Sequence, residues 1–311
     1  AFYLQDKWKL GLSEITAGIR ANYFSETNDW KIEPRLSLNK PLTDKLSLKA
    51  AWGHYSQVVN RIVNENISEG SRDFWILADN ELKPSTSEHW ITGLAYNTNM
   101  YHFSIEGYLK SMNNLVEYSR RFTRADGSSE FFFTGDGLAQ GVEFLFQKKR
   151  GSLTGWLGYT LAKVENTFEV FNDGNPYPAD NDRRHEINGV AKYNRGPWTF
   201  ASTAVFATGR AYTAPESQYI LEMLDGESVS YIHVSDKNAF RLPDYFRMDL
   251  SVSRKFDSDY WKTNVGLSIF NATNHRNVWY REYSLDTTPV TVTDALMLGF
   301  TPTVYVQFNR K

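Results

Sequence analysis

Strict alternation of apolar and polar residues recurs along this chain, and it restricts the fold more than any other feature. In the segment FRMDLSVS, residues 246–253, every second residue is apolar and the residues between are polar or charged. Because side chains of a β-strand point alternately to opposite faces, this segment predicts a strand with one apolar face and one polar face. The alternation alone fits both a soluble sheet, whose apolar face covers a core, and a membrane barrel, whose apolar face meets lipid.

The same alternation predicts strands from one end of the chain to the other. Clear cases lie at residues 15–22, 32–39, 46–53, 103–110, 142–147, 264–269 and 303–308, and weaker ones at 2–10, 88–97, 154–163, 185–193 and 198–208. With residues 246–253 these make about thirteen antiparallel strands, and we find no amphipathic helix of useful length beside them. The chain is therefore expected to be all-β.

The connections between these strands alternate between short and long. Short turns are expected at residues 11–13, 41–45, 97–100, 149–152, 194–197 and 257–262, and long connections at 25–31, 56–87, 113–138, 164–184, 209–245 and 273–300. This alternation is typical of a transmembrane up-and-down β-barrel with tight periplasmic turns and long extracellular loops. A soluble sandwich would show turn signals every ~8 to 12 residues instead. The barrel interpretation makes Phe246, Met248, Leu250 and Val252 face lipid.

Composition excludes several classes of protein. A net charge of -2, from 34 basic and 36 acidic residues, argues against a nucleic-acid partner. The absence of cysteine excludes disulfides and thiolate metal sites. Aromatic residues make up 15% of the chain, and membrane barrels use such residues in girdles at both interfaces.

Four segments resemble one known family. These are AFYLQDKWKL at residues 1–10, YPADNDRRHEINGVAKY at 177–193, RLPDYFRMDLSVSRKF at 241–256 and VGLSIFNATNHRNV at 265–278. The first resembles a mid-barrel strand, and the others resemble the closing hairpins, of TonB-dependent outer-membrane receptors in the style common among Bacteroidota. The resemblance covers essentially the whole chain, in order.

The resemblance implies a barrel of about 22 strands that encloses an N-terminal plug domain. Residues 1–311 would then form the last thirteen strands of that barrel. Single-chain bacterial barrels have an even number of strands, so the odd count also predicts an incomplete barrel. The first strand runs straight into a short turn, which makes it a descending strand entered from an earlier extracellular loop, so we expect the chain to be the C-terminal portion of a longer polypeptide. We therefore expect the plug domain, the TonB-contacting segment and the signal peptide to precede residue 1.

Charged residues at alternate positions are expected to line the lumen. There they would hydrogen-bond one another or contact the plug, and wetting of the lumen alone would also account for them. The residues are Arg20, Arg35, Lys49, Glu106, Glu143, Arg247 and Asp249.

A second set of residues lies near the upper strand ends and in the long loops, where an imported ligand would first make contact. Arginine offers paired donors to carboxylate or phosphate, and tyrosine stacks on sugars or flat rings. An aromatic girdle with solvated loops is the alternative explanation for the same residues. The candidate ligand-binding residues are Tyr55, Tyr118, Arg120, Arg121, Arg124, Arg210 and Tyr212.

The cluster from Asp180 to His185 has acidic, basic and imidazole side chains but is a weak metal site. Arg183 and Arg184 would repel a cation, and Asp and Asn before a strand are ordinary turn residues. We interpret the cluster as a corner between a loop and a strand. We assign no catalytic residue, no metal ligand and no cofactor.

These observations and the resemblance predict a transporter of the bacterial outer membrane rather than an enzyme. A scarce nutrient (siderophore, cobalamin, glycan or peptide) would bind outside and be taken up with energy from TonB, transmitted through the plug. Outer-membrane lipid is a further partner, and a surface lipoprotein is a candidate partner. A barrel protease or lipase and a passive porin are the alternatives.

Overall fold

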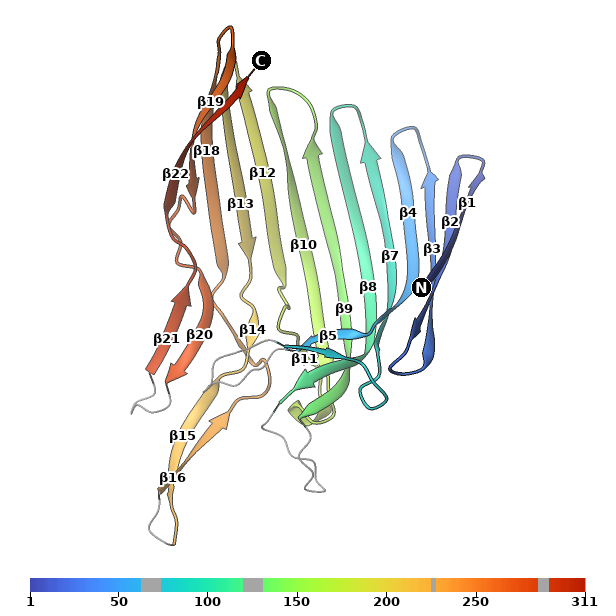
Figure 1. Ribbon diagram of the computed structural model, residues 1–311, viewed down its shortest axis with the longest axis vertical. Coiled ribbons are helices and arrows are strands. Elements are labelled where there is room, and N and C mark those ends of the chain that lie inside the picture. Colours follow the sequence, from blue (N-terminus) through green and yellow to red (C-terminus); the bar gives the residue numbers. More distant parts are fainter. Residues whose placement is uncertain (63–73, 120–130, 225–227, 285–290, 311) are drawn as a thin grey trace.

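The computed structural model describes residues 1–62, 74–119, 131–224, 228–284 and 291–310. Thirteen strands follow one another in one antiparallel sheet, which confirms the strand number expected from the sequence (Figure 1). In order they are β1 (Phe2–Leu10), β2 (Ser13–Phe24), β3 (Asp29–Pro41), β4 (Leu46–Gln57), β7 (Ser85–Asn97), β8 (Tyr101–Tyr118), β9 (Phe132–Lys148), β10 (Leu153–Thr167), β12 (His185–Arg195), β13 (Trp198–Ala207), β18 (Tyr245–Asp257), β19 (Trp261–Phe270) and β22 (Thr301–Arg310).

The tight turns lie at one end of the sheet and the long connections at the other (Figure 1). The long connections contain secondary structure that the sequence did not reveal. The short strands pair as β5 (Val59–Ile62) with β6 (Phe74–Leu77), β11 (Tyr177–Pro178) with β10, β14 (Ala211–Tyr212) with β17 (Phe240–Arg241), β15 (Pro215–Glu222) with β16 (Ser228–Val234), and β20 (Val278–Ser284) with β21 (Thr291–Leu296).

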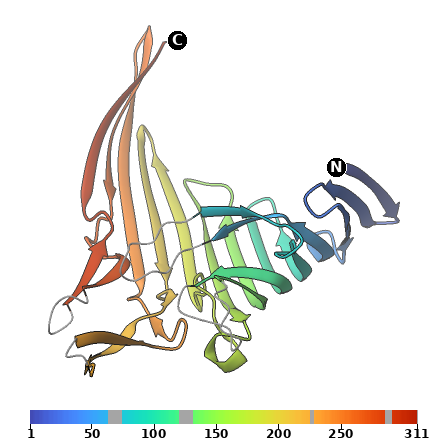
Figure 2. The same cartoon turned by 60° about the horizontal axis from the view of Figure 1, so that its bottom comes forward.

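The sheet is an open, curved trough (Figure 2). Each of the thirteen strands hydrogen-bonds to the next of the thirteen along the chain. Strands β1 and β22 form the two edges of the sheet and do not pair with each other. One short 3-10 helix, η1 (Asn172–Gly174), lies in a long connection, and none of the helices in the described ranges has the length and apolar character to span a membrane.

The register divides the residues of the sheet between two faces. Residues opposite each other on antiparallel strands point to the same side. Lys49 lies opposite Gly93, Gly93 opposite Glu106, and Glu106 opposite Glu143. Followed across the other strands, the register places all seven charged residues expected in the lumen on this one face.

The opposite face is apolar and exposed. Trp90 keeps 55% of its surface and Leu157 keeps 52%, which no core of a soluble protein would allow. Leu250 and Phe200 lie on the same face and are also exposed. An exposed apolar face of this extent is suited to contact with the hydrocarbon of a bilayer.

Substitution of two adjacent residues tests this division between the faces. Leu250 lies in the middle of β18 on the apolar face, and Ser251 beside it lies on the polar face. We expect Leu250→Arg to lower the free energy of unfolding of the full-length protein in lipid vesicles by about 2–4 kcal/mol, since the charge would lie in hydrocarbon. Ser251→Arg is expected to cost less than about 1 kcal/mol, and an equal loss in both variants would contradict the assignment of faces.

Candidate functional site

A cluster of buried aromatic side chains lies where the strand ends meet the long connections. Phe133, Phe168, Phe171 and Tyr177 are almost fully buried and form one aromatic cluster, with Leu115 packed against it. The ring centroids of Phe133 and Phe171 are 5.5 Å apart, as are those of Phe168 and Phe171. This cluster gives the end of the sheet with the long connections a hydrophobic core of its own.

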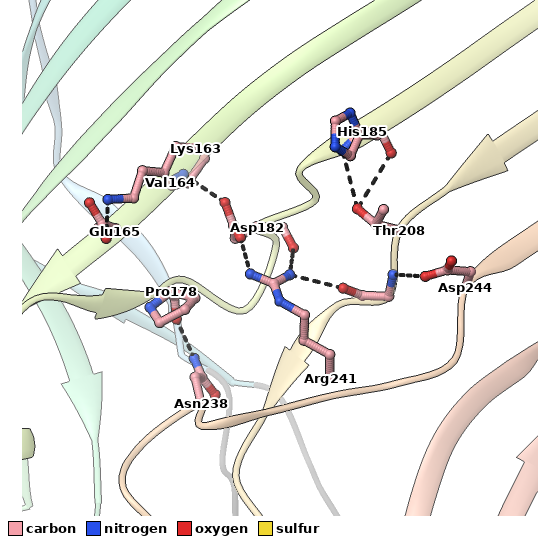
Figure 3. A network of polar contacts seen from close by, with 11 residues as sticks. Lys163, Val164, Glu165, Pro178, Asp182, His185, Thr208, Asn238, Arg241 and Asp244 are labelled. Carbon is pink, nitrogen blue, oxygen red and sulfur yellow. Dashed lines mark hydrogen bonds and ion pairs between the residues drawn. The ribbon is translucent and has the colours of Figure 1, made fainter.

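The buried carboxylate of Asp182 joins the connection between β10 and β12 to the connection between β13 and β18 (Figure 3). One oxygen accepts a hydrogen bond of 2.7 Å from the backbone N–H of Val164, and the other is paired with the guanidinium of Arg241. Arg241 also donates to the backbone carbonyls of Asp182, at 3.2 Å, and of Gly209, at 3.0 Å. A Cβ at position 209 would lie 1.6 Å from the carbonyl oxygen of Leu242, so this position requires glycine.

Asn238 and Lys237 hold the connection between β13 and β18 in place at a second point. The side-chain amide of Asn238, which is 2% exposed, donates to the carbonyl of Pro178 at 2.9 Å and to Asp180 at 2.7 Å. Lys237 forms an ion pair with Glu117, and the hydroxyl of Tyr177 donates to the same carboxylate at 2.9 Å. These contacts fix the connection from β13 to β18 against the end of β8, at Glu117, and against the connection between β10 and β12, at Pro178 and Asp180.

The corner expected at residues 180–185 is confirmed. The turn at Asp180 leads into β12, which begins at His185, and the carboxylates of Asp180 and Asp182 are engaged by Asn238 and Arg241. In the ranges that the structure describes, no group of three or more His, Asp and Glu side chains is arranged to hold a metal ion.

Tyr118, a candidate ligand-binding residue, belongs to an aromatic group at the same end. Its ring centroid lies 5.6 Å from that of Phe74 on β6, 5.4 Å from Phe132 and 6.1 Å from Phe131. Phe131 is 44% exposed, and Trp75, next to Phe74, is 67% exposed. The group offers rings to a flat or apolar ligand. Sequence reasoning missed Phe74 because no alternation marks the short β5–β6 hairpin.

Tyr212 and Arg210 connect β14 with the β20–β21 hairpin. The hydroxyl of Tyr212 is 3.0 Å from that of Tyr283, and Arg281 donates to it at 3.3 Å. Arg210 donates to the backbone carbonyl of Trp279 at 2.9 Å. Burial, with the hydrogen bond to Tyr212, raises the pKa of Tyr283 to about 12.

Arg281 also forms a two-pronged contact with Asp294 across the hairpin. Its Nε donates to one carboxylate oxygen at 2.6 Å and its Nη2 to the other at 2.9 Å. The hydrogen bonds from Arg281 hold the pKa of the Asp294 carboxyl below its usual value of 3.8, and they raise the pKa of the arginine. Sequence reasoning missed this pair because the two residues meet only when residues 278–296 form a hairpin.

The other candidate rim residues are not brought to the same place. Tyr55 lies near the end of β4, with its ring 4.6 Å from the His89 ring and 5.7 Å from the Arg35 guanidinium. It therefore belongs to the polar face of the sheet. Arg120, Arg121 and Arg124 lie outside the described residues. The binding role of all seven residues stays a prediction.

Local polar contacts join some of the charged residues of the sheet's polar face. Arg247 lies 3.2 Å from Asp249 and stacks at 4.7 Å over the Phe270 ring. Asp249 accepts a hydrogen bond of 2.9 Å from the backbone of Asn271, and Arg20 donates to Asn22 at 3.1 Å. Their contact with a plug domain stays a prediction.

Comparison with known proteins identifies the class. The family described as TonB dependent receptor-like, beta-barrel, matches residues 1–272. No curated protein sequence matches the chain. Among solved structures, the chain resembles the siderophore receptor PirA from Acinetobacter baumannii, with 16% identity and a TM-score of 0.59. The match covers 88% of this chain and 41% of PirA. It also resembles the FrpB iron transporter from Neisseria meningitidis, with 14% identity and a TM-score of 0.61; this match covers 98% of this chain and 44% of FrpB. The match to the outer membrane transporter YddB from Escherichia coli has 12% identity and a TM-score of 0.62, and it covers 99% of this chain and 44% of YddB.

The chain is therefore part of a transmembrane β-barrel of the bacterial outer membrane. It belongs to the TonB-dependent receptor-like β-barrel family, as the sequence resemblance indicated. It spans less than half the length of the solved structures that it resembles. At these identities, the likeness to the solved structures shows the fold alone.

Loss of the Arg241 side chain is expected to release the connection between β13 and β18. Arg241→Leu leaves the buried carboxylate of Asp182 without its cation, which costs about 1.5–3 kcal/mol of local stability. We expect faster cleavage of residues 209–245 in limited proteolysis of the full-length protein. Arg276→Leu, at an exposed arginine of the next long connection, is the control and is expected to leave that rate unchanged. Equal rates in both variants would contradict the fastening role.

Lowering the pH is expected to loosen the β20–β21 hairpin. The pKa of Asp294 is lowered in the folded state, so its contribution to stability is present above the unfolded value of 3.8 and lost as the pH falls through the folded value. Asp294→Asn should therefore speed hydrogen exchange in residues 278–284 and 291–296 at pH 7, but hardly at about pH 2. Asp259→Asn, in a tight turn at the other end, is the control. An effect of Asp294→Asn that is independent of pH would contradict the ion pair.

Proposed function

We propose that residues 1–311 form the C-terminal part of the barrel of a TonB-dependent receptor that takes up a scarce nutrient across the outer membrane. The observation that carries the proposal is the open thirteen-stranded sheet of this family's barrel, with tight turns at one end and hairpin-bearing loops at the other. The remaining strands of a barrel of about 22 would join the edges β1 and β22, and a plug domain would occupy the lumen. The TonB contact would belong to that plug.

The ligand would bind at the extracellular end. The exposed rings beside Tyr118 lie there. The polar group around Tyr212 and Arg210 lies there too, on the connection that Arg241 fixes to Asp182. Arginine and tyrosine suit an anionic or aromatic chelate. The PirA and FrpB structures carry the names of a siderophore receptor and an iron transporter. A ferric chelate is therefore our first candidate ligand, ahead of cobalamin, glycans and peptides.

Fixed loops and lumen charges favour this function over the two alternatives. The family is one of receptors, and a barrel protease or lipase would need a nucleophile and base that the sequence does not reveal. A passive porin would leave its channel open, whereas large barrels of this class hold a filled lumen. A surface lipoprotein over the loops remains a candidate partner of the receptor.

Growth on single nutrient sources tests the proposal. We expect deletion of the gene to abolish growth on at least one member of a panel of ferric chelates, cobalamin, oligosaccharides and peptides. A strain without TonB should show the same loss even with the gene present, because uptake needs energy from the inner membrane. Growth that requires the gene but not TonB, together with a constantly open channel in single-channel recordings, would support the porin and overturn the proposal.

Complementation with matched tyrosine variants places the binding site. Tyr118→Ala is expected to lower ligand affinity about tenfold, since a buried aromatic contact contributes on the order of 1 kcal/mol. Tyr260→Ala removes a 75% exposed tyrosine from a tight turn at the opposite end and should complement fully. Equal ligand affinity and equal complementation by the two variants would contradict a ligand site at Tyr118.

A further inference from the structure

Side chains on the apolar face change in character with depth near the tight turns of β12, β13 and β18, which lie side by side in Figure 1. Arg195, Trp198 and Arg254 stand opposite one another in the register and form the row next to the turn between β12 and β13. Further in on the same face, the register gives a row of Ala191, Ser202 and Leu250. The row between them consists of Tyr193, Phe200 and Val252.

Two adjoining hollows cover these rows. The first, about 780 Å³, is lined by Arg195 and Trp198 together with Tyr193 and Phe200. The second, about 380 Å³, is almost wholly apolar and extends inward past Leu250. Tyr193 and Phe200 line both hollows, so a charged pocket at the membrane surface continues into an apolar groove.

The charge of this pocket is positive. Arg195 lines the first hollow. The guanidinium of Arg254 is not part of that lining but lies next to it, 5.2 Å from the ring centroid of Trp198 and 4.8 Å from that of Phe256. The register places no aspartate or glutamate on the apolar face of β12, β13, β18 or β19. Within the described ranges, no acidic side chain forms an ion pair with Arg195 or Arg254.

We propose that this surface is a binding site for an anionic phospholipid of the periplasmic leaflet. The phosphate lies beside Arg195, which lines the first hollow, and within reach of Arg254, which stands across Trp198 from it in the register. An acyl chain lies along the groove past Phe200 and Leu250. Arginine donates paired hydrogen bonds to phosphate oxygens, and the aromatic row matches the boundary between headgroups and hydrocarbon. A zwitterionic lipid gains less because its own cation competes, and free phosphate does not use the groove.

Native mass spectrometry of the full-length protein in detergent tests the site. We expect the protein to retain one added phosphatidylglycerol in preference to phosphatidylethanolamine. The double variant R195Q/R254Q is expected to bind phosphatidylglycerol about 10- to 30-fold more weakly, since each arginine near a membrane surface contributes on the order of 1 kcal/mol. A shift of band mobility on heating shows that each variant has folded.

A second pair of charges at the same end gives the matched control. Lys148 lies at the end of β9 on the apolar face and Arg150 in the turn after it, and β10 separates both from β12, β13 and β18. K148Q/R150Q removes the same charge and should retain phosphatidylglycerol as the wild type does. Equal loss in both double variants, equal retention of the two lipids, or competition by millimolar inorganic phosphate alone would overturn the proposal.

Discussion

Hydrogen bonding of the backbone is the constraint on which the rest of this structure depends. In hydrocarbon, every unpaired N–H or carbonyl costs several kcal/mol, so a strand can cross a membrane only when both neighbours are paired in register. The thirteen strands meet this condition everywhere except at the outer edges of β1 and β22. Because the register is fixed, the side-chain faces are fixed with it, and Glu106 and Glu143 must share a side while Leu250 takes the other.

At the extracellular end this constraint no longer applies, and the chain uses different means to become ordered. There the backbone can reach water, so loops are allowed, but their entropy must be offset by packing. The aromatic cluster of Phe133, Phe168, Phe171 and Tyr177 supplies a core, and Arg241 connects Asp182 to Gly209. The loops are thus held as one unit beside the exposed rings and polar groups that would contact a ligand.

Much of the sheet could be predicted from the sequence because alternation is a local signal. The fastening of the loops could not, since Arg241 and Asp182 are 59 residues apart and neither belongs to a periodic segment. The sequence also did not predict the end of β8 next to its long connection. The expected strand covered residues 103–110 and a long connection was expected from residue 113, whereas β8 continues to Tyr118 past an irregularity between Met112 and Leu115. Asn114 there has a φ of 54°, and the extra residues break the alternation that marks a strand.

The two faces of the sheet also explain where charge is tolerated. On the polar face, charged residues occur at many depths because water or another domain can solvate them. On the apolar face of β12, β13 and β18, arginine occurs only in the row next to the tight turns, outside the aromatic row of Tyr193 and Phe200. A cation deeper on that face would cost about 2–4 kcal/mol. At the surface the same cation meets phosphates of opposite charge, so depth decides whether an outward-facing arginine destabilises the barrel or binds the membrane around it.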